Sequence, residues 1–511
     1  MKHTFRRGLA LAMIAFASMM TACGGGGGSS SPAPSVNAPG APGAPAAPGA
    51  PSATPTPAST PSPSTTPVTE PQQGITILPD TTGRFGLIQL TDDYGGNNGP
   101  MTAAQIQSEA PHYDAVWGAF QPAVWHQYAG HAMILSRYEV PFEDEYLITG
   151  HNVQWFQQNH PDWILYGCQS NGTPTSDYAW SGTGAAFGSD VPLNIHNSAV
   201  VTYEVNSLAQ YMIANGYNAI AVDQMTFENF LLSPNPNLEG TGPNAGWYGC
   251  GYYPNGPANG NFQRVYGSAS GGDLYAADQT FIQDEINWVQ MAKQIFSTDY
   301  SSYNLKILVN HPPLASTPTS QEQQLLSYVD GTVDENGFTN YGKYTSSGLP
   351  SLFTNTLAYT QYLQSTLHKA VFITYYFCAA GNGSPCPTSA ANLSGPQADW
   401  ALATYAIANM GGADAYIVPN GVDSYSYRPE FAQTYGTPCG NYTEVGSNVY
   451  ERRFENGLAI VNASYSPQSV TLPNHTYTDI EGRSVGGAGS TLNLQGSDGY
   501  MLLTTGGNGC S

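Results

Sequence analysis

From residue 75 onward, short continuous apolar runs alternate with longer stretches in which apolar residues recur at helical spacing. Continuous apolar runs are typical of parallel strands that are buried on both faces. The runs that predict strands are 85–90, 113–120, 132–140, 217–223, 306–310, 331–335, 370–377 and 413–418. The stretches that predict helices are 103–110, 150–160, 198–215, 278–296, 321–328, 354–368 and 397–409.

This order of elements predicts an α/β fold, a (β/α)8 TIM barrel, because strands and helices alternate through the whole region. An open doubly wound sheet is the alternative. The first predicted strand, however, is not followed by the GxGxxG turn that dinucleotide-binding sheets use. The barrel is therefore the fold that we expect.

The pattern changes after about residue 450, where helical spacing disappears. Short runs joined by Gly, Asn, Ser and Pro turns predict strands at 458–462, 468–472, 477–480, 491–494 and 500–504. We expect a small C-terminal antiparallel β domain that is built like a β-sandwich.

The N-terminus is typical of an export signal. Lys2, Arg6 and Arg7 precede the apolar run 8–20, which is too short to cross a bilayer as a stable helix. The run ends in the sequence MTAC, which resembles a bacterial lipobox and predicts that Cys23 carries lipid. An ordinary secretory signal that contains a cysteine is the alternative.

These patterns predict four regions of the chain. Residues 1–22 are a signal peptide, and 23–74 are the lipidated cysteine with a Gly-, Ser- and Pro-rich tether that cannot bury a core. Residues 75–445 form the barrel, and 446–511 form the β domain. We expect a monomer that is exported and anchored by lipid at the cell envelope, at the outer membrane, or released outside the cell.

Charge narrows the choice of partner. The 14 Lys and Arg residues against 36 Asp and Glu residues give a net charge of −22. Nucleic acid is excluded as a partner because phosphate binding needs clustered cations. The same charge disfavours strongly anionic glycans and any membrane contact other than the N-terminal lipid.

The cysteines agree with export. Apart from Cys23, six remain, and an even number in an exported protein predicts three disulfides. Nearness along the chain favours the pairs Cys168–Cys250, Cys378–Cys386 and Cys439–Cys510. The sequence contains no CxxC pair and no HxxxH cluster, so it does not indicate a metal site.

Acidic residues are placed at the ends of predicted barrel strands, where catalytic groups of such barrels project. Asp223 ends the fourth strand and Glu335 follows the sixth, so we predict them as the catalytic pair. A carboxylate pair suits glycoside cleavage, which needs a proton donor and a nucleophile or base. The structural alternatives are a helix N-cap for Asp223 and a solvated acidic turn for Glu335.

Other polar or aromatic residues near strand ends are predicted to contact substrate, and each has a structural alternative as a cap, an ion pair, a loop-shaping residue or a core residue. They are Asp92, Asp93, Arg137, Glu139, Asn310, His311 and Tyr375.

Five segments resemble a known family. Residues 160–167 (HPDWILYG), 193–197 (LNIHN) and 216–223 (GYNAIAVD) are followed by 330–338 (DGTVDENGF) and 450–462 (YERRFENGLAIVN). Together they resemble hypothetical glycosyl hydrolase family 15, a family of glycoside-hydrolase-like (β/α)8 barrels. Asn218, Gln224 and His196 depart from that family's pattern.

The resemblance implies a glycosidase with one carboxylate after strand four and the other after strand six, similar to the α-galactosidase clan. It implies Asp223 as nucleophile or general base and Glu335 as general acid, although the roles are exchangeable. The substrate is then a polysaccharide or oligosaccharide, with no cofactor. A non-catalytic carbohydrate-binding lipoprotein on a barrel scaffold is the alternative, while a serine esterase is disfavoured because no strand ends in GxSxG.

Overall fold

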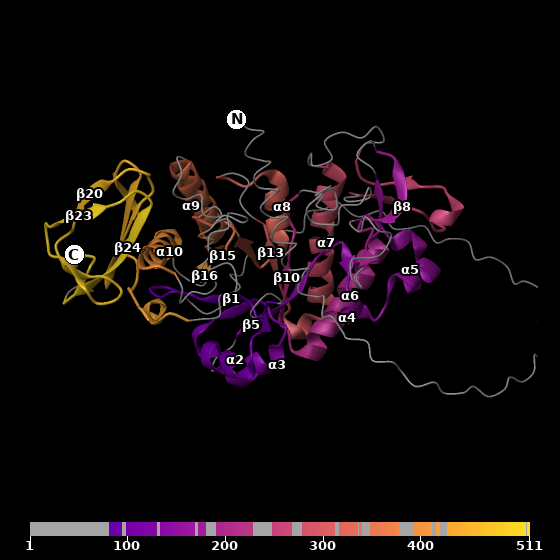
Figure 1. Cartoon of the computed structure of the whole chain (residues 1–511), viewed down its shortest axis with the longest axis horizontal. Coiled ribbons are helices and arrows are strands. Elements are labelled where there is room, and N and C mark those ends of the chain that lie inside the picture. Colours follow the sequence, from indigo (N-terminus) through magenta and orange to yellow (C-terminus); the bar gives the residue numbers. More distant parts are fainter. Residues whose placement is uncertain are drawn as a thin grey trace, which may run out of the picture. The chain divides into compact units, whose positions relative to one another are not determined.

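The computed structural model contains an eight-stranded parallel sheet whose strands are hydrogen-bonded in chain order (Figure 1). The strands are β1 (Ile88–Thr91), β4 (Ala115–Gly118), β5 (Ile134–Glu139), β10 (Ala219–Val222), β13 (Lys306–Asn310), β14 (Gly331–Asp334), β15 (Ala370–Thr374) and β16 (Ala415–Val418). The first and last strands, β1 and β16, lie beside each other, so the sheet curves into a barrel. The predicted (β/α)8 barrel and all eight of its predicted strands are confirmed.

The structure describes residues 81–94, 99–129, 133–168, 172–179, 191–227, 248–267, 278–311, 316–335, 337–339, 348–375, 377, 393–410, 415–418, 427–506 and 508–511. Cys23, Cys378 and Cys386 lie outside these ranges, as do the predicted signal peptide and tether. Among the described helices, none is both long and apolar enough to span a bilayer.

The helices follow the strands as expected. They are α2 (Ala103–Glu109), α3 (Pro122–Tyr128), α4 (Tyr146–Thr149), α5 (Val153–Asn159), α6 (Ser198–Asn215), α7 (Gln279–Thr298), α8 (Ser320–Tyr328), α9 (Leu349–Ser365) and α10 (Gly395–Ala408). Capping boxes begin three of them, at Thr102, Thr319 and Ser394, where the hydroxyl satisfies a free backbone N–H. The short helices α3 and α4 were not predicted.

Side chains alternate between the inside and the outside of the barrel. One separate core cluster is made only of alternate strand residues, and it fills the interior: Ile88, Leu90, Ala115, Trp117, Ala219, Ala221, Leu308, Val333, Ala370 and Phe372. The residues between them, such as Val116, Val222 and Val309, pack outward in the larger cluster that includes helix residues. Each strand therefore has an inward row and an outward row.

Two connections at the carboxyl ends of the strands build a second, antiparallel sheet. Its strands are β7 (Tyr166–Cys168) and β8 (Pro174–Tyr178), between β5 and α6, and β11 (Tyr248–Tyr252) and β12 (Gln263–Arg264), between β10 and α7. The disulfide Cys168–Cys250 joins the two connections, which confirms one predicted pair. This sheet was not predicted.

The C-terminal region is the predicted antiparallel β domain. A six-stranded sheet contains β17 (Thr443–Gly446), β18 (Val449–Phe454), β19 (Gly457–Asn462), β24 (Asp498–Thr505), β21 (Thr476–Thr478) and β22 (Ser484–Gly486). A two-stranded sheet of β20 (Gln468–Thr471) and β23 (Thr491–Leu494) lies against it over an apolar core. The disulfide Cys439–Cys510 confirms a second predicted pair.

Helix α10 connects the barrel to the β domain. Every residue from Ala398 to Ala408 is buried, because the barrel covers one side of the helix and β19 and β24 cover the other. Gly499 permits the close approach, since a Cβ there would lie 3.1 Å from Ala403 Cβ and from Trp400 Cα. A helix that is apolar all round fits such a position between two layers.

Asp399 lies in this interface and is only 7% exposed. Burial raises its pKa to about 7, and the nearby charges of Glu481, Asp479 and Asp498 act in the same direction. The folded protein therefore holds a proton that the unfolded chain releases between about pH 4 and 7. Stability falls as pH rises through this window, because the folded state binds the extra proton.

We expect Asp399→Asn to remove this pH dependence. The variant should unfold at the same temperature as the native chain near pH 4.5 and roughly 2 °C higher at pH 8, measured by circular dichroism. Asp299→Asn, at an exposed carboxylate after α7, is the matched control. An equal shift at both pH values would contradict the assignment.

Candidate active site

Asp223 lies at the carboxyl end of β10 and is 3% exposed. Its Oδ2 accepts a hydrogen bond from the Tyr138 hydroxyl at 2.6 Å. Its Oδ1 accepts hydrogen bonds from Asn310 Nδ2 at 2.7 Å and from the Gln224 backbone N–H at 2.8 Å. Three donors on one carboxylate hold it in a fixed orientation.

The inward rows explain why these groups meet. Tyr138 extends the row of Ile134 on β5, Asp223 extends the row of Ala221, and Asn310 extends the row of Leu308. The three strands are neighbours in the sheet, so their carboxyl ends lie side by side. Glu335 extends the inward row of β14, the next strand, and is 3% exposed. The structure thus places the two predicted catalytic carboxylates at one end of the barrel interior.

Tyr138 links the two carboxylates electrostatically. Burial raises the pKa of its hydroxyl well above the usual value, and the charges of Asp223, Glu143 and Glu335 raise it further. The phenol therefore stays protonated and serves as a hydrogen-bond donor. Asn310 contributes a second feature, since its buried Oδ1 accepts no hydrogen bond from the described residues. Such an acceptor suits a ligand hydroxyl.

The backbone after Asp223 adopts an uncommon conformation. Gln224 has φ of 60° and Phe227 has φ of 63°, in the left-handed region that residues with a Cβ seldom occupy. The segment is held in place, because Phe227 N–H donates to Glu285 Oε2 at 3.1 Å and the Met225 carbonyl bonds His311 Nδ1. Backbone strain of this kind is often found at functional sites.

A tight turn positions Glu335. Asp334 Oδ1 accepts from the Gly337 N–H at 3.0 Å and closes the turn. Gly337 has φ of 45°, and a Cβ there would lie 2.1 Å from the Thr374 carbonyl oxygen, so only glycine fits. Asp334 therefore shapes the turn while Glu335 continues the inward row.

Four of the predicted substrate contacts occupy outward rows. Arg137 is buried and forms an ion pair with Glu145, and its guanidinium lies 5.8 Å from the ring of Tyr211 in α6. Burial would lower the Arg137 pKa, but Glu145 and Glu139 together raise it above its usual value. The Arg137 side chain therefore lies between the barrel strands and the surrounding helices, not in the barrel interior.

The other three predicted substrate contacts in outward rows are Glu139, His311 and Tyr375. Burial raises the pKa of Glu139 well above its usual value, and Glu145 and Glu204 raise it further. His311 is fully buried and lies 3.4 Å from Glu322 Oε1. Tyr375 is also fully buried, with its hydroxyl 2.8 Å from Thr404 Oγ1.

Asp92 follows β1, but its carboxylate contacts protein donors. It accepts from the backbone N–H groups of Phe120 at 2.6 Å and Gln121 at 3.0 Å, and from Trp125 Nε1 at 2.8 Å. Burial raises its pKa above the usual value, against the effect of these hydrogen bonds. The arrangement fixes the segment that leads into α3, and Trp125 of that helix, against the end of β1. Asp93 belongs to the two-residue strand β2.

Tyr138 is the site residue that sequence reasoning missed, although both of its neighbours in the sequence were selected. Alternation from the apolar residue Ile134 identifies it, because position 138 shares the row of position 134. Among the described residues, no group of three His, Cys, Asp or Glu side chains has the geometry to hold a metal ion.

No family model matches the chain, and no curated protein matches its sequence. Several solved structures resemble it weakly. A maltogenic α-amylase from Thermotoga neapolitana is 10% identical, with a TM-score of 0.45 over 85% of this chain and 100% of the other. An α-glucosyl transfer enzyme is 11% identical, with a TM-score of 0.45 over 83% and 100%. A family 36 α-galactosidase from Geobacillus stearothermophilus is 10% identical, with a TM-score of 0.41 over 83% and 56%.

We expect Asp92→Ala to destabilise the fold. The substitution leaves two backbone N–H groups and the Trp125 indole N–H without an acceptor, which should lower the free energy of unfolding by about 3 kcal/mol. Urea unfolding at pH 7 measures the change, with the exposed Asp299→Ala as control. Unchanged stability with weaker binding of a sugar would instead indicate a substrate contact.

Proposed function

We propose that the protein is a glycoside hydrolase that uses Asp223 and Glu335 as its catalytic carboxylates. The observation that carries the proposal is the cluster at the end of the barrel interior. Asp223 is held by Tyr138 and Asn310, and Glu335 lies close enough for its charge to raise the pKa of Tyr138. Two carboxylates in distinct surroundings are what glycoside cleavage requires.

The surroundings of each carboxylate support different roles. Asp223 is held in a fixed orientation by its three donors, and we assign it the attack on the anomeric carbon or the removal of a proton from the attacking water. Glu335 is buried at the same end of the barrel interior, and we assign it the role of general acid, which carries a proton before the reaction. It donates that proton to the glycosidic oxygen, and the leaving sugar departs as an alcohol.

Tyr138 and Asn310 position the reacting carboxylate. Their hydrogen bonds reach different oxygens of Asp223 and so fix the rotation of the carboxylate plane. The unpaired Oδ1 of Asn310 is an acceptor for a hydroxyl of the bound sugar. Fixed geometry of this kind accounts for much of the rate enhancement of enzymes.

The net charge of −22 favours a neutral or amine-bearing glycan over a strongly anionic one. The second candidate function is carbohydrate binding without cleavage, which the same polar cluster would also permit. The two functions differ in whether reducing ends are released. We also propose that the chain belongs to hypothetical glycosyl hydrolase family 15, because five of its segments resemble that family: 160–167, 193–197, 216–223, 330–338 and 450–462.

The setting of the protein is part of the proposal. We propose removal of residues 1–22, a lipid on Cys23, and a tether to residue 74 that carries a monomeric barrel (75–445) and β domain (446–511) at the cell envelope. The two disulfides support an oxidising compartment outside the cytosol.

We expect Asp223→Asn and Glu335→Gln to remove hydrolysis without unfolding the protein. The first should lower kcat at least about 10³-fold, and the second about 10²–10⁴-fold. Release of reducing ends from a panel of neutral polysaccharides measures activity, and circular dichroism checks folding. Asp299→Asn should keep full activity.

Full activity in both amide variants would overturn the catalytic pair. If the native chain releases no reducing ends but binds a polysaccharide, the non-catalytic function is correct.

Tyr138→Phe should lower kcat by about 10–100-fold with little change in KM, because it removes one hydrogen bond to a charged group. Tyr375→Phe is the matched control, since the Tyr375 hydroxyl bonds Thr404 alone among the described residues, on the outside of the barrel. Equal activity in the two variants would show that the Tyr138 hydroxyl has no part in catalysis.

A further inference from the structure

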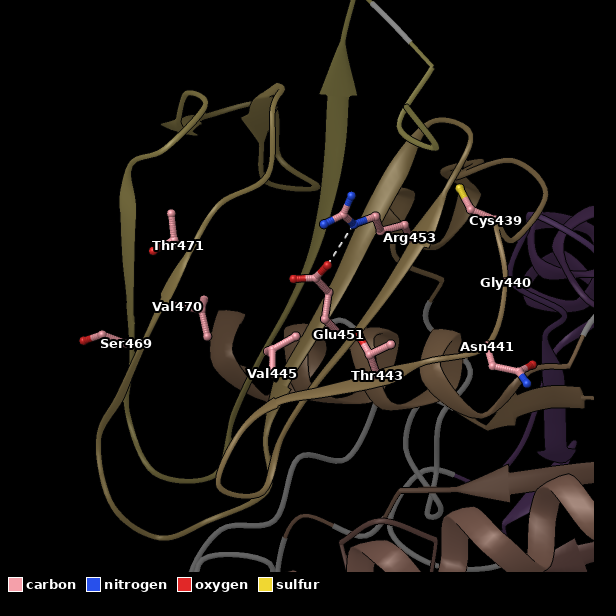
Figure 2. Close-up of a pocket in the computed structure, with 10 residues that line it drawn as sticks. All are labelled: Cys439, Gly440, Asn441, Thr443, Val445, Glu451, Arg453, Ser469, Val470 and Thr471. Atoms are coloured by element: carbon pink, nitrogen blue, oxygen red, sulfur yellow. Dashed lines mark hydrogen bonds and ion pairs between the residues drawn. The ribbon is translucent and has the colours of Figure 1, made fainter.

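The C-terminal β domain contains a pocket far along the chain from Asp223. It has a volume of about 640 Å³ and lies between β17 and β18 on one side and β20 on the other (Figure 2). Ten residues line it: Cys439, Gly440, Asn441, Thr443, Val445, Glu451, Arg453, Ser469, Val470 and Thr471. The volume lies within the range of small-molecule sites, which is about 300–1,000 Å³.

An ion pair lies on the wall of the pocket. Glu451 and Arg453 are two residues apart on β18, so they share the face of the strand that turns toward the pocket (Figure 2). Arg453 Nε donates to Glu451 Oε1 at 2.9 Å. The terminal nitrogens of the guanidinium make no hydrogen bond with the described residues, and the Arg453 side chain is 43% exposed. These donors are available to a ligand.

The pair is suited to a neutral ligand with neighbouring hydroxyl groups. Its charges cancel, so it gives little attraction to a carboxylate, sulfate or phosphate. A donor beside an acceptor matches two vicinal hydroxyls, since each hydroxyl both donates and accepts. Thr443, which pairs with Glu451 across β17 and β18, adds a further hydroxyl.

The pocket also has apolar contacts for the ring of such a ligand. Val445 is 47% exposed although it is apolar, and Val470 lies opposite on β20. A pyranose has hydroxyls around its edge and C–H groups on its faces, so valine and polar side chains together fit its two kinds of surface.

The walls are fixed before any ligand arrives. The disulfide Cys439–Cys510 anchors the segment that leads into β17. The Cys439 N–H donates to the Arg453 carbonyl at 2.9 Å, and Arg452 Nε donates to the Gly440 carbonyl at 3.1 Å. A preformed site loses less conformational entropy on binding.

We propose that this pocket is a second, non-catalytic site that binds a neutral sugar unit of the polysaccharide. The choice of a sugar rests on the proposed function, whereas the polyhydroxyl chemistry follows from the pocket. The site holds one part of the polysaccharide on the β domain while another part of the same polysaccharide enters the barrel. Binding at the second site therefore raises the substrate concentration near the catalytic carboxylates.

Affinity electrophoresis of the full chain tests the site. Asp223→Asn is used as the parent so that the polymer is not consumed, and mobilities are referred to gels without polysaccharide. The probes are a soluble α-glucan, a β-glucan, a xylan and a galactomannan, with polygalacturonate as the anionic probe. We expect at least one neutral probe to retard the parent.

Two added substitutions probe the pocket separately. Arg453→Ala removes the free donors, and Glu451→Ala removes the acceptor beside them on β18. Each should weaken retardation at least fivefold. Arg483→Ala is the matched control, because Arg483 is an exposed cation of the same domain that pairs with Asp479 and Glu481 outside the pocket. It should leave retardation unchanged.

The site is overturned if no neutral probe retards the parent, if polygalacturonate alone does so, or if both pocket variants bind as the parent does. Failure of the proposed function has a different signature. The native chain would then release no reducing ends, while retardation and its loss in the two variants would remain.

Discussion

The alternation of side chains along the barrel strands governs the position of every group in the candidate active site. Residues two apart share a row, so Tyr138, Asp223, Asn310 and Glu335 extend the rows that fill the interior. Arg137 and Glu139 differ from Tyr138 by one position, yet both face the helices. A shift of one residue in the register of β5 would exchange the phenol for a guanidinium or a carboxyl group.

Neutral donors, rather than cations, stabilise the buried carboxylates of this site. The sequence has 36 acidic and only 14 basic residues, so most acids cannot form an ion pair. Asp223 is bonded by a phenol, an amide and a backbone N–H, and Asp92 by an indole and two backbone N–H groups. Neutral donors hold a carboxylate in place without adding a positive charge beside it.

The barrel could be predicted from the sequence because local pattern determines it. The bounds predicted for α6, β13 and β23 coincide with those of the structure. The disulfide Cys168–Cys250, with a sequence separation of 82, was predicted. The sheet of β7, β8, β11 and β12 around it could not be predicted, because its strands are short and a disulfide does not specify which strands pair or in which register. Tyr138 was missed because a tyrosine in an apolar strand is usually a core residue, whereas a charged residue in such a strand indicates a functional or paired group. Which row a residue occupies depends on strand bounds that a pattern gives only approximately.

Helix α10 makes the barrel and the β domain interdependent. Its buried residues from Ala398 to Ala408 face the barrel on one side and β19 and β24 on the other. Loss of the last strands would expose the apolar side of the helix to water and favour aggregation. Although the sequence texture changes near residue 450, the barrel and the β domain belong to one compact unit. A side chain at Gly499 of β24 would press on Ala403 and Trp400 of α10, and so on the helix that covers this side of the barrel.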